Sequence, residues 1–92
     1  MQFPKLIGNI KISDEEGKVV IAGDPEGLRS LGSLLAWLAD ADQEQWPYLP
    51  PGGWAHIHIY PKHDLSADSR DVELMRLDAK GTGAFPAGFP AR

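Results

Sequence analysis

The sequence contains no cysteine, and this absence excludes several kinds of function. Without cysteine there is no disulfide framework, no thiolate nucleophile and no Cys-ligated zinc site. Positive charge is also scarce, because 9 Lys and Arg face 13 Asp and Glu, for a net charge of −4. Nucleic-acid binding depends on basic side chains that neutralise phosphates. We therefore expect no nucleic-acid partner.

Long apolar runs are missing as well. The longest apolar region, around residues 34–39, is far shorter than the roughly 20 residues that cross a membrane. The first eight residues hold one Lys and no apolar stretch typical of a signal peptide. These features predict a cytoplasmic protein without membrane contact.

The length and hydrophobic content predict one small domain. Its 92 residues are 42% hydrophobic, and a chain of this length is expected to have a radius of gyration of roughly 12 Å. We expect an α+β domain over residues 1–77 and a Gly/Pro-rich tail over residues 78–92. The tail is either extended or docked through Phe85 and Phe89.

The first part of the chain predicts a β-hairpin. Residues 6–13 and 18–22 contain many β-branched side chains, and Glu16-Gly17 between them suits a tight turn. This register pairs Ile12 with Ile21 and keeps the apolar side chains on one face.

A helix over residues 25–41 follows. Asp24 suits an N-cap and Pro25 suits the first helical position. The apolar side chains then recur at helical spacing and form a stripe of about 120°. Its members are Leu28, Leu31, Leu34, Leu35 and Leu38.

Two more strands are predicted at residues 54–60 and 71–77, after a proline-rich loop at residues 43–53. The order β-β-α-β-β predicts a two-layer α+β fold, with a four-stranded antiparallel sheet and the helix on one face. We expect a core of Ile10, Ile12, Ile21, Leu31, Leu35, Leu38, Ile57 and Ile59.

His56 and His58 are the most suggestive pair for chemistry. Residues i and i+2 of a strand point the same way, so both imidazoles can reach one metal ion. A third ligand would come from His63, Asp64 or Glu73. Two histidines without a fixed third ligand are more typical of a plain surface or an interface than of a metal site. We therefore expect no metal and no cofactor, and keep a site at His56, His58 and His63 as the alternative.

Two other patterns contain chemical residue types but lack the geometry for catalysis. His63, Asp64, Ser66 and Ser69 offer the groups of a hydrolytic triad without a nucleophile elbow. The run Gly23–Gly27 at a helix start places Asp24 and Glu26 where a phosphate would bind. We expect no enzymatic activity.

Acidic and aromatic side chains lie close together after the predicted helix. Trp37 is on its polar face, so the loop, the tail or another chain must cover it. The predicted protein-binding surface consists of Trp37, Asp40, Asp42, Glu44, Trp46 and Tyr48. A second surface faces away from the helix, and we expect it to form a homodimer or to be covered by the tail. It consists of Trp54, His56, His58 and Tyr60.

Four segments resemble a known family. They are the run Val20–Leu28, the leucine-rich helix to Ala39, the strand with His56-Ile-His58, and the run Ser69–Leu74. Together they resemble the immunity protein 32 family of bacterial polymorphic toxin systems, over roughly residues 18–77. The resemblance implies a cytoplasmic protein that binds and neutralises a cognate toxin, with no catalysis of its own. The alternative function is a small metal-dependent enzyme or metal-binding protein that uses His56 and His58.

Overall fold

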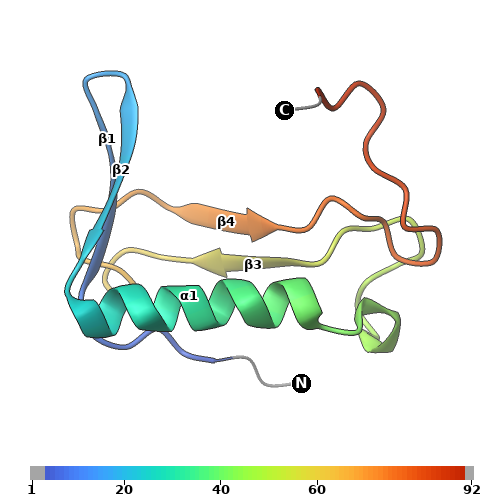
Figure 1. Ribbon diagram of the computed structural model, residues 1–92, viewed down its shortest axis with the longest axis horizontal. Helices are drawn as coiled ribbons and strands as arrows, with labels where there is room; N and C mark the ends of the chain where they lie inside the picture. Colours follow the sequence, from blue (N-terminus) through green and yellow to red (C-terminus); the bar gives the residue numbers. More distant parts are fainter. Residues whose placement is uncertain (1–3, 91–92) are drawn as a thin grey trace.

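A computed structural model describes residues 4–90 and shows an α+β fold. The hairpin strands β1 (Ile10–Glu15) and β2 (Lys18–Gly23) come first, followed by helix α1 (Pro25–Asp40). A short 3-10 helix, η1 (Gln43–Gln45), leads to strands β3 (His56–Ile59) and β4 (Val72–Met75). The hairpin rises beside one end of the helix, while β3 and β4 run alongside the helix (Figure 1).

The hairpin has the register that its sequence predicts. Ile12 lies opposite Ile21 in the antiparallel pair β1–β2. Glu16 and Gly17 form the tip with φ of 52° and 79°, the left-handed values that a type I′ turn requires at both central residues. Turn chemistry and side-chain alternation therefore agree.

Helix α1 begins as expected. The Asp24 carboxylate accepts a hydrogen bond from the backbone N–H of Gly27 at 2.7 Å, and Pro25 occupies the first turn. Gly27 also lets the preceding chain approach, because a Cβ atom there would lie 2.2 Å from the carbonyl oxygen of Asn9. The helix ends at Asp40, one residue before the predicted end.

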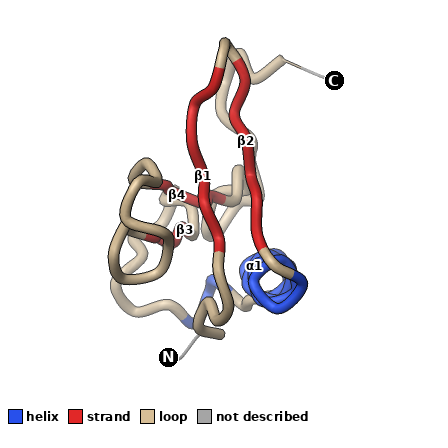
Figure 2. Tube along the Cα trace, turned by 90° about the vertical axis from the view of Figure 1, so that its left-hand side faces the viewer, coloured by secondary structure: helices blue, strands red, loops and turns tan. Residues whose placement is uncertain are grey.

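The predicted four-stranded sheet is wrong. The structure has two separate two-stranded sheets, β1–β2 and β3–β4. The loop between β3 and β4 occupies the free edge of β1, where the N–H groups of Ser66 and Arg70 each donate a hydrogen bond of 2.8 Å to carbonyls of β1. The N–H of Ile12 in turn donates to the Ser69 hydroxyl at 3.1 Å. This edge is therefore closed to a further strand (Figure 2).

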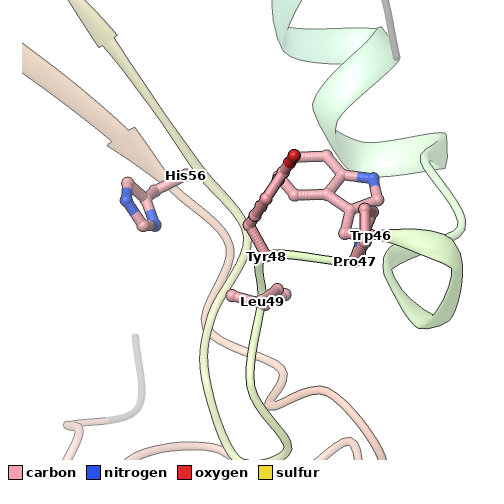
Figure 3. A pocket seen from close by; sticks show the side chains of 5 residues that line it. All are labelled: Trp46, Pro47, Tyr48, Leu49 and His56. Atoms are coloured by element: carbon pink, nitrogen blue, oxygen red, sulfur yellow. The ribbon is translucent and has the colours of Figure 1, made fainter.

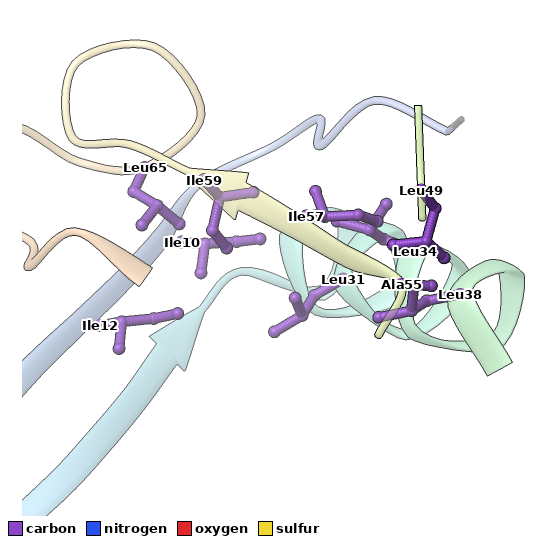
Figure 4. Close-up of a cluster of buried hydrophobic side chains, with 10 residues drawn as sticks. All are labelled: Ile10, Ile12, Leu31, Leu34, Leu38, Leu49, Ala55, Ile57, Ile59 and Leu65. Carbon is purple, nitrogen blue, oxygen red and sulfur yellow. The ribbon is translucent and has the colours of Figure 1, made fainter. Parts of the chain in front are cut away.

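Most of the predicted core is confirmed. The helix, β1, β3 and the connecting loops contribute to one apolar cluster (Figure 4): Ile10, Ile12, Leu31, Leu34, Leu38, Leu49, Ala55, Ile57, Ile59 and Leu65.

Two predicted core residues are wrong, since Leu35 is 45% exposed and Ile21 is 54% exposed. The helix turns Leu34 inward, where it is 1% exposed, and leaves Leu35 on the flank of the stripe. Ile21 lies on the outer strand of a hairpin that projects from the body (Figure 1). This projection fits the radius of gyration of 14.6 Å, which exceeds the expected value.

Leu34 and Leu35 form a matched pair for a stability test. Replacing the buried Leu34 by Ala removes apolar contacts and leaves a cavity, so we predict a loss of about 2–5 kcal/mol in the free energy of unfolding. Leu35→Ala removes the same atoms from a half-exposed position and should cost less than about 1.5 kcal/mol. Urea unfolding of both variants measures the difference. Equal losses would contradict the observed orientation of the helix.

Candidate functional site

The aromatic side chains at the end of α1 pack on one another. The ring centroids of Trp37 and Trp46 lie 5.7 Å apart at an angle of 32°, and both residues are partly buried against the core cluster. Of the three possible covers for Trp37, the structure therefore shows the loop. Trp46, the first residue after η1, contributes this cover. The loop can form the short helix η1 because the prolines of the loop lie farther along the chain.

The predicted acidic side chains lie within five residues around the end of the helix, and all three are exposed. Asp40 is the last residue of α1. Asp42 caps η1 by accepting a hydrogen bond from the N–H of Glu44 at 3.2 Å. Glu44 accepts a hydrogen bond from the N–H of Gly81 at 2.7 Å. The short polar turn thus presents negative charge beside the paired tryptophans.

Arg76 is one residue of this region that the sequence analysis missed. Its guanidinium donates hydrogen bonds to the carbonyls of Leu38 at 3.2 Å and Ala41 at 2.7 Å. It also pairs with Asp78 through two hydrogen bonds of 2.9 and 2.6 Å. The last turn of α1 has no basic residue of its own, and a helix C-terminus favours a cation. The lack of a basic residue in the last turn of α1 was the signal in the sequence that could have indicated a cationic side chain from elsewhere in the chain.

Residues after Arg76 hold the loop at residues 43–53 through hydrogen bonds. The Lys80 ammonium donates to the carbonyls of Trp46 at 2.9 Å and Leu49 at 2.7 Å. The side-chain amide of Gln43 donates to the carbonyl of Asp78 at 2.8 Å. The first residues of the predicted tail therefore fix the loop, while the rings of Phe85 and Phe89 are 67% and 53% exposed.

A pocket of about 390 Å³ lies between this loop and the start of β3. Its lining comes from Trp46, Pro47, Tyr48, Leu49 and His56 (Figure 3). Tyr48 is 97% exposed, so its ring stands at the surface without cover from the rest of the described chain. The pocket joins the predicted protein-binding surface to the histidine strand, a connection that the sequence did not indicate.

The predicted alternation of the third strand is confirmed. Ala55, Ile57 and Ile59 are buried, whereas His56 and His58 are exposed. The exposed rings follow one another along the strand, with centroids 5.2 Å apart for His56 and His58 and 6.1 Å apart for His58 and Tyr60. Trp54 is only partly exposed.

Glu73 joins the histidines. Within residues 4–90, the ligand atoms of His56, His58 and Glu73 all lie within 4.8 Å of one another. His63 is not part of this group, because it lies in the tight loop that Tyr60 and Asp64 close by a hydrogen bond of 2.9 Å. Of the third ligands considered, the structure therefore brings Glu73 to the pair.

Several of the remaining candidate residues have structural partners. Ser66 bonds to Asp68 at 2.8 Å, and Ser69 accepts the N–H of Ile12 as described above. The Asp24 carboxylate occupies the helix N-terminus where an anion would bind, and hydrogen bonds from Asn9 and Gly27 hold the pKa of Asp24 below its usual range.

Comparison with known protein families finds a match. The sequence pattern of the family described as immunity protein 32 matches residues 18–76, more than half of the chain. Neither curated proteins nor solved structures gave a match. In the part of the chain that the structure describes, no helix has the length and apolar character to cross a membrane.

The Arg76–Asp78 pair predicts a specific dependence of stability on pH. Its hydrogen bonds lower the pKa of Asp78 below that of the unfolded chain, so the stabilisation is present above the unfolded pKa of about 4 and is lost as pH falls through the folded pKa. Asp78→Asn should lower the free energy of unfolding at pH 7, and its difference from the parent should shrink below about pH 4. Urea unfolding across pH measures this.

Asp71→Asn is the matched control, since that exposed carboxylate belongs to none of the ion pairs of the described residues. Asp24 and Asp68 have lowered pKa values as well and stay in every variant. If the Asp78→Asn curve ran parallel to the parent at all pH values, the pair would not contribute as described.

Proposed function

Because the chain belongs to the immunity protein 32 family, we propose that it is a cytoplasmic protein that binds a cognate toxin and neutralises it by covering the toxin's surface. Toxin binding itself requires neither catalysis nor a cofactor. The family match is the observation that carries this proposal. The matched residues 18–76 include the whole acidic and aromatic surface and the pocket beside it.

Charge supports the position of the toxin-binding surface. Asp40, Asp42 and Glu44 are exposed at one place in a chain of net charge −4. A concentrated negative potential accelerates encounter with a basic partner and suppresses encounter with an acidic one. A toxin with a basic surface is therefore the partner chemistry that fits.

Shape supports the same surface. Protein interfaces obtain most of their binding energy from a few desolvated anchors, which are enriched in tryptophan, tyrosine and arginine. Tyr48 is fully available to a partner, and the adjoining pocket can accept a side chain from it. Trp37 and Trp46 pack against the core cluster and so fix the loop that carries Tyr48 to the body of the protein.

The second surface, Trp54, His56, His58 and Tyr60, keeps its role as the proposed homodimer face. His56, His58 and Tyr60 are exposed in the single chain. Pairing of two copies would cover these side chains. Light scattering in the presence of a chelator should give the mass of two chains. The mass of one chain would remove this part of the proposal.

The function is tested by expressing the chain together with the toxin that copurifies with it from the source cell's lysate. Toxin alone should arrest growth, and the parent chain should restore growth. Asp40→Lys/Asp42→Lys should fail to restore it. Glu15→Lys/Glu16→Lys is the control, because it makes the same change of charge at the exposed hairpin turn and should still protect. A copurifying protein that never arrests growth would refute the proposal.

Binding kinetics separate the two contributions to the interface. Reversing Asp40 and Asp42 should slow association and weaken its dependence on salt, because rim charges act mainly on encounter. Tyr48→Ala should instead raise the dissociation rate, as loss of an anchor costs about 2 kcal/mol or more, a factor of roughly 30. Surface plasmon resonance measures both rates, with unfolding curves to show that the fold persists. If both variants bind like the parent, the toxin would bind the second surface instead.

A further inference from the structure

We infer that His56, His58 and Glu73 form a binding site for a divalent transition-metal ion of the zinc type. This inference goes beyond toxin binding and does not depend on it. The three side chains project from one face of the β3–β4 ladder. His56 and His58 are two residues apart on β3, and Glu73 on β4 lies directly opposite His58.

The distances fit a metal site with little movement. The candidate ligand atoms lie within 4.8 Å of one another. Tetrahedral zinc with bonds of about 2.0–2.1 Å brings its ligand atoms to roughly 3.4 Å from each other. All three side chains are exposed in the single chain, so small rotations about their side-chain bonds can close this gap without disturbing the core.

His56 makes the kind of hydrogen bond that fixes the tautomer of a metal-ligating histidine. Its Nδ1 lies 2.9 Å from the carbonyl oxygen of Trp54. A carbonyl only accepts hydrogen bonds, so Nδ1 carries the proton and the lone pair of Nε2 is free. Metal-ligating histidines have this arrangement, in which a backbone carbonyl fixes the tautomer and the ring direction. The hydrogen bond is the second observation, besides the cluster itself, that indicates a ligand.

The Glu73 carboxylate is available to an ion. It takes part in none of the three ion pairs of the described residues, whose acidic partners are Asp68, Asp14 and Asp78. The residue opposite His56 on the same face is Met75, which brings no positive charge to compete with a cation.

The donor set selects the class of ion. Two imidazoles and one carboxylate suit zinc, copper or nickel, whereas magnesium and calcium prefer oxygen ligands alone. Three protein ligands leave at least one coordination position for water or for an incoming group. Since His56 also lines the pocket beside Tyr48, the ion would lie at the rim of that pocket.

The test is calorimetric titration of the tag-free chain with zinc chloride, and separately with magnesium chloride. We expect one zinc ion per chain and no magnesium binding. His58→Gln and Glu73→Gln should each weaken zinc binding by roughly tenfold or more, since even supporting residues of metal sites have effects of 10–100-fold. His63→Gln is the matched control and should bind zinc like the parent. Circular dichroism should show that each variant keeps the fold.

Long-range ¹H–¹⁵N spectra of the histidines test the geometry. On addition of zinc, the resonance of His56 Nε2 should shift to the range of a metal-bound nitrogen, while Nδ1 should keep its proton. The inference is wrong if zinc does not bind, if magnesium binds equally well, or if His63→Gln loses as much affinity as His58→Gln. Coordination through Nδ1 of His56 would also overturn it.

Discussion

The guanidinium of Arg76 connects the parts of the molecule on which the proposed toxin-binding surface depends. It binds the carbonyls of Leu38 and Ala41 at the end of α1 and the carboxylate of Asp78 at the same time. The helix end would otherwise place its negative dipole beside Asp40 and Asp42, an unfavourable arrangement for the folded chain. With a cation in place, these acidic residues can remain exposed at the helix end. Lys80 then extends the same arrangement by holding the aromatic loop through two carbonyls.

Local patterns predicted the type and order of the main helix and of the four strands, but not all of their bounds. Strand β1 begins at Ile10 rather than at residue 6, β3 and β4 are shorter than predicted, and η1 lies within the predicted loop. The hairpin register follows from alternating apolar residues around Glu16-Gly17, and the start of α1 follows from Asp24 and Pro25. The alternation of the histidine strand follows from period two alone. Sheet architecture was not predictable in this way, because a pattern within one strand does not reveal what occupies its edge. In this chain the backbone of Ser66 and Arg70 occupies the edge of β1.

The functional surface was predicted only in part for the same reason. The acidic and aromatic residues are close in sequence, so their proximity was visible. The residues that hold them, Arg76 and Lys80, act across 31 to 38 positions of the chain. The pocket also required the fold, because it brings His56 beside Tyr48. Likewise, Glu73 was one of three possible third ligands until the β3–β4 register placed it opposite His58.

The central claim is that a toxin covers the helix end, the aromatic loop and the rim of the pocket. Hydrogen–deuterium exchange of the chain, free and bound to its toxin, tests this claim most directly. The account predicts that binding slows amide exchange at residues 40–49 and around His56, and leaves exchange in the hairpin strand β2 unchanged. Slower exchange confined to β2, with residues 40–49 unaffected, would contradict it.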